Sequence, residues 1–439
     1  MVRLAAPRGG ARSRGGVTDL AQAVGNDDPH ASGADAANDP IALVRAALAR
    51  RTAVNASFFG AEAGRTAGLC HRMAERFARD GRLVAIGRTP AACSDVRHVA
   101  VEFVHPVIVG KRALPALGLV GGSGPLPRQA DLVLEPDDIV IAFGTDEDAT
   151  GETRAALALA RERGCLTIAY GAAEAEWDFP VESPDPFVRQ EVVETHYHVL
   201  WELVHVFFDH RGLLEGRQAR VVHDPGESRF LYPFLGERET DLAAVLDDVR
   251  SSVIMKSEEI AGLRRQTLVE GTGALAAAAG ELRRRLDAGG TLLAFGNGGS
   301  ATDAMDVVAD FRLPPHGWPP RRALDLTEDP AILSAIANDI GTDAIFSRQI
   351  IAYGRSGDVA IGVSTSGNSR NVIEALAEAR RRDLLTVALV GYDGGRVAAE
   401  RLADHVVVTR SEHIPRIQEA QASAYHLLRE LVEAAADGG

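Results

Sequence analysis

Short apolar runs alternate with amphipathic segments along most of the chain. The apolar runs are rich in Val, Ile, Leu and Ala and are bounded by Gly, Asp or Ser, a pattern typical of buried strands in a parallel sheet. They predict strands at residues 83–86, 139–143, 166–170, 291–295, 359–363 and 385–390. Helical periodicity predicts helices at 94–103, 151–163, 186–209, 301–311, 370–381 and 415–433, with two helical stretches within 40–80 and two more at 242–268 and 272–288. This alternation indicates an α/β fold with a mostly parallel sheet.

The order of these elements occurs twice. Asp-Ile-Val-Ile-Ala-Phe-Gly at 138–144 aligns with Asp-Val-Ala-Ile-Gly-Val-Ser at 358–364, and residues 163–171 align with 382–391 with one extra residue. We therefore predict an internal duplication, in which two copies of one α/β domain pack as a pseudo-dimer.

Two segments without regular periodicity give the predicted domain boundaries. Residues 1–40 are rich in Gly, Ala, Asp and Arg and lack the apolar centre of a signal peptide, so we expect a disordered tail. Residues 215–240 contain several Pro and Gly residues and are a candidate linker. The two predicted domains are then residues 41–214 and 241–439.

Composition narrows the class of partner. The formal net charge of −14 argues against nucleic acid or an anionic membrane surface. No apolar run approaches the roughly 20 residues that span a bilayer. The three cysteines have no metal-type spacing and suggest no disulfide framework, which fits a reducing cytoplasm. We therefore expect a cytoplasmic protein with a small-molecule ligand.

Two Gly- and Ser-rich loops point to the ligand. Gly-Asn-Gly-Gly-Ser at 296–300 and Ser-Thr-Ser-Gly-Asn-Ser at 364–369 each follow a predicted strand and open a predicted helix. Such junctions present free backbone N–H groups and the positive end of a helix dipole, and the hydroxyls add further donors. An ordinary helix N-cap explains one such loop but hardly both. A phosphate-bearing small molecule is therefore the expected ligand.

Six motifs in the second half carry a family resemblance. They lie at 296–305, 335–341, 345–349, 364–369, 391–395 and 416–419. With them, residues from about 241 to 433 resemble the phosphoheptose isomerases, a branch of the sugar isomerase (SIS) domain proteins. Members convert sedoheptulose 7-phosphate to an aldoheptose 7-phosphate, D-glycero-D-manno-heptose 7-phosphate, with flavodoxin-like domains in zinc-containing homo-oligomers. The resemblance implies two SIS domains here, the first degenerate, and a homodimer with four SIS domains.

The resemblance also implies the residues that bind the sugar phosphate. The positions that match the family's phosphate and sugar contacts are Asn297, Gly298, Ser300, Asp329, Ser364, Thr365, Ser366, Ser369 and Gln418.

The family's zinc and catalytic positions are divided between the halves. The family has a His and a Glu four apart on the helix after the first loop, and a Gln and a His eight apart on the last helix. The first half keeps all four residue types, as His98, Glu102, Gln190 and His198, and the second half has Asp306, Asp310, Gln418 and His426. The resemblance implies Glu102 and His198 as the proton-transfer pair, with Asp310 and His426 as the second-half alternative. A carboxylate one methylene shorter than Glu displaces the base by about 1 Å, which can cost roughly 100-fold in rate.

The first half has lost the phosphate loops instead. Gly-Arg-Thr-Pro at 87–90 replaces the first loop, and Gly-Thr-Asp-Glu-Asp at 144–148 replaces the second, where three acidic residues repel a phosphate. Each half thus lacks what the other keeps. We therefore hypothesise one composite site, with the phosphate held by the second half and the metal and proton transfer supplied by the first.

The chemistry expected of such a site is aldose–ketose isomerisation through an enediol. That reaction needs a base, an acid or metal that polarises the carbonyl, and a handle that positions the substrate. Two other functions stay open: a non-catalytic phosphosugar-binding protein, such as a sensor or assembly factor, and a lyase or epimerase with the same enediol chemistry. Asp306 and Asp310 favour the binding protein, whereas the intact set in the first half favours catalysis.

Plainer roles also exist for several of these side chains. His98 could be a structural histidine, and Asp306 and Asp310 could be solvated helix residues. We expect His196, His205 and His210 on exposed faces of the long helix at 186–209 and just after it. The three tryptophans, Trp177, Trp201 and Trp318, are expected to pack.

Overall fold

The computed structural model describes residues 39–107, 111–122, 124–171, 173–209 and 241–434. Nearly all of the predicted tail (1–40) and the whole predicted linker (215–240) lie outside the described residues, so these boundaries stay predictions.

Each half contains a five-stranded parallel sheet. The first comprises β1 (Leu83–Ile86), β2 (Ala116–Leu119), β3 (Ile139–Ala142), β4 (Leu166–Ala169) and β5 (Trp177–Asp178), in the order β2-β1-β3-β4-β5. The second comprises β6 (Leu292–Phe295), β7 (Ala323–Asp325), β8 (Val359–Ser364), β9 (Leu385–Gly391) and β10 (His405–Thr409), in the order β7-β6-β8-β9-β10. The strand order is therefore the same in both halves, and it is the flavodoxin-like one. The α/β fold with two flavodoxin-like parallel sheets is confirmed.

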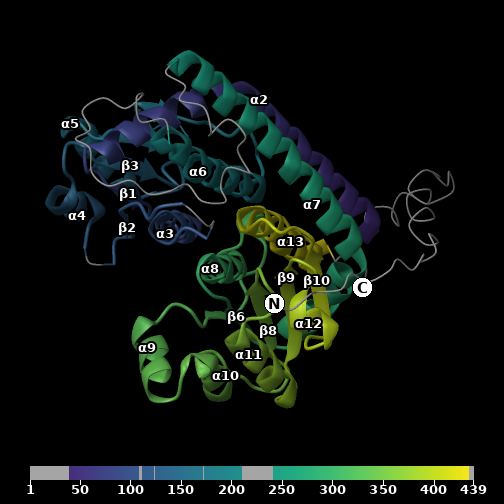
Figure 1. The fold of residues 1–439 in the computed structure, drawn as a ribbon. Helices are drawn as coiled ribbons and strands as arrows, with labels where there is room; N and C mark the ends of the chain where they lie inside the picture. The colour runs from purple at the N-terminus through teal and green to yellow at the C-terminus, as the bar shows by residue number, and fades with distance from the viewer. Residues whose placement is uncertain (1–38, 108–110, 123, 172, 210–240, 435–439) are drawn as a thin grey trace, which may run out of the picture.

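Helices flank both sheets (Figure 1). The first half has α2 (Pro40–Ala78), α3 (Pro90–Val104), α4 (Leu126–Val133), α5 (Glu152–Glu162) and α6 (Pro186–Asp209). The second half has α7 (Leu242–Asp287), α8 (Gly299–Arg312), α9 (Pro330–Asp339), α10 (Ser347–Tyr353), α11 (Arg370–Arg381), α12 (Gly395–Ala399) and α13 (Ile414–Ala434). Because helices cover both faces, every residue of β1, β3, β4, β6, β8 and β9 is buried, which explains their unbroken apolar runs.

The helical stretches expected in pairs before each sheet are single long helices. α2 has 39 residues and α7 has 46. The break expected in α7 included Gly271. This glycine is helical in the structure, and its Cα, which carries no side chain, packs against β10. A Cβ there would lie 3.0 Å from Val407 Cγ1. The glycine thus marks close packing rather than the end of a helix.

The two halves meet through equivalent helices. α2 packs against α7, α3 against α8, and α6 against α13, and Figure 1 shows α2 and α7 running side by side along one flank. Each contact joins the same element of the two halves, as in a two-fold dimer. The second copy of each helix therefore provides the partner surface that a second subunit would otherwise supply.

This arrangement buries α6, and it corrects one expectation. His196 is fully buried and His205 is 5% exposed, so neither lies on an exposed face; His210 lies outside the described residues. The reason is tertiary, because α2, α3, α7 and α13 all pack against α6. Trp201 is fully buried, as expected of a packing residue. None of the helices in the described ranges combines the length and apolar character that crossing a bilayer requires.

Candidate active site

Six buried side chains from both halves form the centre of the interface. We call them the histidine cluster: His98 and Glu102 on α3, Tyr197 and His198 on α6, and Gln418 and Glu419 on α13. His98 Nε2 lies 3.3 Å from His198 Nε2 and 3.0 Å from Gln418 Nε2. The predicted His98 and His198 thus come together, and the glutamine beside them belongs to the second half.

The outer nitrogens of the two imidazoles are held by neighbours. His198 Nδ1 lies 3.0 Å from Glu419 Oε1, and His98 Nδ1 lies 3.0 Å from the hydroxyl of Tyr197. A carboxylate accepts the Nδ1 proton, so the contact with Glu419 assigns the proton of His198 to Nδ1 and leaves a lone pair on Nε2. That lone pair faces His98.

This geometry fits a metal ion. Ligand atoms of His98, Glu194 and His198 all lie within 4.8 Å of one another. Two imidazole nitrogens bound to one tetrahedral zinc ion at about 2.0–2.1 Å stand roughly 3.3 Å apart, which matches the separation of the two Nε2 atoms. Glu194 Oε1 and Glu102 Oε2 are buried and have no hydrogen-bond partner among the described residues. The side chains present are therefore of the type and spacing that zinc requires.

Burial sets the protonation states of the cluster. It lowers the pKa of His98 well below its ordinary value and that of His198 to about 3, so both imidazoles are neutral, as metal ligands must be. It raises the pKa of Glu102 to about 8, with the negative charges of Glu202 and Glu419 adding to the effect. A carboxyl group that titrates near neutral pH suits proton transfer.

The first predicted phosphate loop touches the histidine cluster. α8 begins at Gly299, and a Cβ at this position would lie 1.9 Å from Gln418 Nε2 and 3.0 Å from His98 Nε2. Only glycine fits there, because its backbone lies against both side chains. Ser300, the next residue, is buried at the same helix terminus.

The second loop lies beside the first. β6 and β8 are adjacent parallel strands, so both loops leave the same edge of the sheet. The side-chain amides of Asn297 and Asn371 exchange two hydrogen bonds of 2.9 Å, which join the first loop to α11. Ser364 Oγ lies 3.2 Å from Ser369 Oγ and accepts from the backbone N–H of Gly367 at 3.2 Å. The structure thus brings the two serine-rich loops together.

A second cluster repeats the first with the halves exchanged. We call it the aspartate cluster: Asp306 and Asp310 on α8, Tyr425 and His426 on α13, and Gln190 and Glu191 on α6. Gln190 Nε2 donates to Asp306 Oδ1 at 2.9 Å, and the hydroxyl of Tyr425 donates to Oδ2 at 3.2 Å. His426 Nδ1 lies 2.9 Å from Glu191 Oε1. Each contact has its counterpart in the histidine cluster.

The aspartates of this cluster are not solvated helix residues. Asp306 and Asp310 are each 7% exposed. Burial raises the pKa of Asp310 to about 7 and that of Asp306 to about 6. Although burial opposes it, the hydrogen bond to Glu191 and the charge of Asp310 raise the pKa of His426, whose Nε2 lies 3.6 Å from Asp310 Oδ2.

Comparison with known proteins agrees with the resemblance found in the sequence. The SIS domain family profile matches residues 257–391. The phosphoheptose isomerase of Geobacter sulfurreducens is 41% identical over 193 residues, which are 43% of this chain and 97% of that protein. That of Geobacter metallireducens is 45% identical over 166 residues, 37% of this chain and 85% of that protein. The chain belongs to the phosphoheptose isomerase family.

Among solved structures, the C-terminal domain of glucosamine-fructose-6-phosphate aminotransferase from Francisella tularensis matches 89% of this chain and 94% of that one. The TM-score is 0.55 and the identity is 9%. At this identity the likeness concerns the fold alone, and its coverage extends over both halves. The phosphoheptose isomerase relatives, in contrast, match less than half of this chain.

Gln190 lies away from the place expected for it, and Asp329 follows β7 at the start of α9. Gln190, expected beside His98, belongs to the aspartate cluster, and Gln418 takes its place, because α6 and α13 meet at the interface and each glutamine faces the opposite half. Asp329 is exposed and caps α9, where its Oδ1 accepts from the backbone N–H groups of Ala331 and Ile332.

Three residues of the histidine cluster and its surroundings escaped the analysis of the sequence. Glu194, Tyr197 and Glu419 all contact or face the two imidazoles. A signal existed for Glu194, which lies four residues before His198 and so on the same face of α6. For Tyr197 and Glu419, the sequence offered only one indication of a role in the site: they are the direct neighbours of His198 and Gln418.

Proposed function

We propose that this member of the family is an aldose–ketose isomerase, converting sedoheptulose 7-phosphate to D-glycero-D-manno-heptose 7-phosphate at one composite site. The observation that carries the proposal is the contact of Gly299 with His98 and Gln418. It brings a phosphate loop of the second half directly against the metal-type cluster whose histidines come from the first half. The aspartate cluster, without the family's His and Glu, is not the site of the reaction.

The second half holds the phosphate in this proposal. Backbone N–H groups at the starts of α8 and α11 point toward the edge where the two loops meet. The hydroxyls that accompany them are those of Ser300, Ser364, Thr365, Ser366 and Ser369. Binding energy from the phosphate then positions C1 and C2 of the sugar beside the histidine cluster, which lowers the barrier without direct chemistry at the phosphate.

Glu102 is the group that transfers the proton from C1 to C2 of the sugar. Its carboxylate removes the proton from C1 of the ketose, the electron pair forms the C1–C2 double bond, and the carbonyl oxygen takes a proton to give the enediol. Return of a proton to C2, with loss of the O1 proton, gives the aldose. Zinc held by His98, His198 and Glu194 would supply a Lewis acid for the carbonyl oxygen. His198 suits the role of ligand better than that of acid, because its pKa of about 3 keeps it neutral.

The test is turnover in deuterated water. Purified protein with sedoheptulose 7-phosphate, with and without added zinc, is followed by proton NMR, and we expect new aldoheptose phosphate that carries deuterium at C2. Glu102→Gln should abolish the signal, whereas the matched control Glu162→Gln, at an exposed position of α5, should retain it. If the zinc-loaded wild-type protein does not convert the substrate, the proposed isomerase activity is refuted.

A non-catalytic phosphosugar-binding protein is the second candidate. The observation in its favour is that α8, which follows a phosphate loop, carries Asp306 and Asp310 where the family has His and Glu. A binding protein of this kind would show a thermal shift with sedoheptulose 7-phosphate. It would incorporate no deuterium into the sugar, with or without added metal.

We also propose that two chains associate into a homodimer with four SIS domains. Light scattering after size exclusion should then give about twice the chain mass of 46.6 kDa. A mass equal to that of one chain would contradict this assembly.

A further inference from the structure

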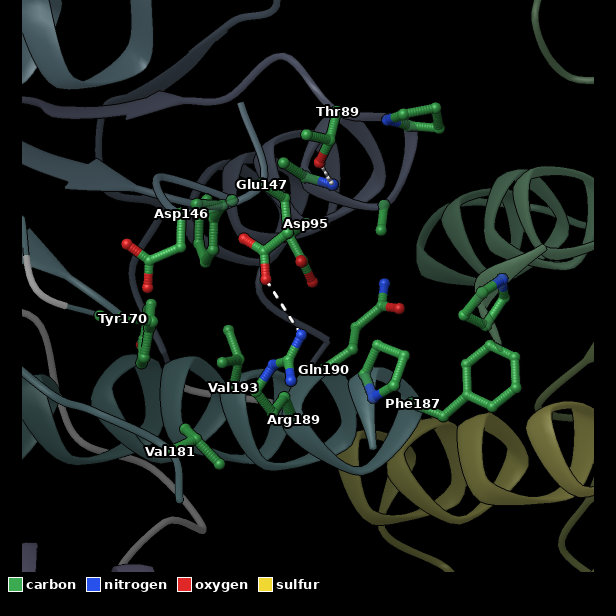
Figure 2. Close-up of a pocket in the computed structure, with 18 of the residues that line it drawn as sticks. Thr89, Asp95, Asp146, Glu147, Tyr170, Val181, Phe187, Arg189, Gln190 and Val193 are labelled. Atoms are coloured by element: carbon green, nitrogen blue, oxygen red, sulfur yellow. Dashed lines mark hydrogen bonds and ion pairs between the residues drawn. The ribbon is translucent and has the colours of Figure 1, made fainter. Parts of the chain in front are cut away.

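A cavity of about 380 Å³ lies beside the aspartate cluster (Figure 2). The loops that replaced the phosphate loops in the first half line one side of it, and α6 and the end of α8 line the other. Thr89, Gly144, Gln190 and Asp310 are among the lining residues. The cavity lies beside the aspartate cluster as the proposed phosphate site lies beside the histidine cluster. It is therefore the counterpart of the phosphate site in the other half of the chain.

The cavity is not built for an anion. Thr89 Oγ1 accepts from the backbone N–H of Ala92 at 3.2 Å and so occupies a donor at the start of α3, and Pro90 has no N–H to offer. The second loop closes on the first, since a Cβ at Gly144 would lie 2.8 Å from Thr89 Oγ1. Two of the backbone positions at the start of α3 therefore offer no free donor to a phosphate.

Four of the side chains that line the cavity are acidic and one is basic. Asp95 and Asp310 are buried at 7% exposure, and Asp146 and Glu147 are more exposed. Arg189 is the one basic residue that lines the described cavity, and it donates to Glu147 at 3.1 Å. Asp146 is paired with Arg154, so among the described residues Asp95 and Asp310 are the lining acids that form no ion pair with an Arg or Lys. Burial raises the pKa of both, and a cationic ligand would stabilise their charged form.

One of the buried carboxylates is left without a full set of partners. Asp310 Oδ2 has no hydrogen-bond partner among the described residues, and His426 Nε2 lies 3.6 Å from it. A buried carboxylate oxygen that lacks a donor is costly. A ligand that brings an N–H donor with positive charge would remove that cost.

The rest of the lining is apolar and aromatic. The rings of Phe143 and Tyr170 stack with centroids 5.6 Å apart and an interplanar angle of 14°. Pro180, Val181 and Val193 also line the cavity. Such walls suit the hydrocarbon part of a ligand, and an aromatic face also attracts a cation.

We propose that this cavity binds a small organic cation, a primary amine with an apolar or aromatic ring, whose ammonium group lies at Asp310 and Asp95 and whose ring lies against Phe143 and Tyr170. The copy of the domain that lost its phosphate loops has thus kept its pocket for a ligand of opposite charge. This site is separate from the histidine cluster, and its existence does not depend on the isomerase activity.

Calorimetric titration of the full chain with benzylamine tests the proposal. Benzyl alcohol has nearly the same shape without the charge, and benzoate carries the opposite charge. We expect saturable one-to-one binding of benzylamine, at least tenfold weaker binding of benzyl alcohol, and weaker binding still of benzoate. Equal affinities for amine and alcohol, or no saturable binding of the amine in the millimolar range, would overturn the proposal.

Variants locate the binding. Asp310→Asn should weaken benzylamine at least tenfold, and Val181→Trp, at a half-buried position of the wall, should block it by filling the cavity. Asp247→Asn, at an exposed position of α7, is the control and should bind as wild type does. If Asp310→Asn fails to fold, Val181→Trp decides alone, and unchanged binding in that variant places the amine elsewhere and refutes the site.

Discussion

The histidine and aspartate clusters are made from equivalent positions and differ at few of them. Both keep a tyrosine and a histidine from one last helix, and a glutamine followed by a glutamate from the other. The residues that differ are on α3 and α8. His98 and Glu102 on α3 occupy the positions that Asp306 and Asp310 occupy on α8. The shared residues make equivalent contacts in both clusters, and in our proposal the differing pair decides the chemistry.

The loops differ in the opposite sense. The loop against the histidine cluster, at Gly299, is the one predicted to bind phosphate, whereas the loops around the aspartate cluster offer Thr89, Pro90 and acidic side chains. In a symmetric dimer every change would affect both sites alike. A duplicated chain can change one copy at a time, so under our proposals one site keeps the catalytic chemistry while the other takes a different ligand.

The largest expected effect comes from making the two clusters alike. The double variant His98→Asp and Glu102→Asp gives α3 the residue types of α8. We expect turnover to fall by roughly 10³-fold or more, because both the metal ligand and the positioned base are lost. Bound zinc should fall with it in metal analysis.

The thermal shift with sedoheptulose 7-phosphate serves as the control for that variant, because the phosphate loops are untouched. A variant that binds the sugar phosphate and still turns over at the wild-type rate would show that the histidine cluster is not catalytic.

A smaller effect is expected where the loop meets the cluster. Gly299→Ala places a methyl group where Gln418 Nε2 lies and pushes His98 as well. A displacement of about 1 Å at the reacting groups can cost roughly 100-fold, so we expect a loss of that order in kcat. Gly280→Ala in α7 is the matched control, because a Cβ there meets open space. Equal kcat values for the two variants would show that the loop at Gly299 does not position the catalytic site.

The sequence predicted the buried strands because each is an unbroken apolar run. It did not predict the outer strands β2, β5, β7 and β10, none of which is buried along its whole length. Spacing put His98 and Glu102 on one helix face, because residues four apart share a face, and the family resemblance implied that His198 joins them. The exchange of Gln190 for Gln418 depends on how α6 meets α13, which is a tertiary contact that no local pattern records.

A third pair of variants compares equivalent loop positions in the two halves. Thr365 lies in the serine loop of the second half, and Thr145 is its counterpart in the first. Thr365→Ala should raise KM for the sugar phosphate about tenfold, because a hydrogen bond to a charged group contributes roughly 1.5 kcal/mol. Thr145→Ala should leave KM unchanged. Steady-state kinetics of both variants decides, and a similar change in both would mean that the first half also binds the phosphate.

The smallest effect concerns stability in acid, where the halves also differ. His196 on α6 corresponds to Ala424 on α13 and is fully buried, with Nε2 2.9 Å from Thr66 Oγ1 and Nδ1 3.0 Å from the hydroxyl of Tyr170. Burial lowers the pKa of His196 to about 3, below the ordinary histidine value of about 6.5. Between these values the unfolded chain binds the extra proton, so the free energy of unfolding falls as the pH falls below 6.5.

For this single group the loss is about 2 kcal/mol by pH 5. His196→Phe removes the titrating group and keeps an aromatic ring beside Phe58 and Phe179. Urea unfolding at pH 7 and pH 5 should therefore show a smaller acid-dependent loss in the variant than in the wild type, by about that amount. Parallel losses in the two proteins would mean that His196 is already protonated in the folded first half, and that the acid sensitivity of the fold comes from groups common to both halves.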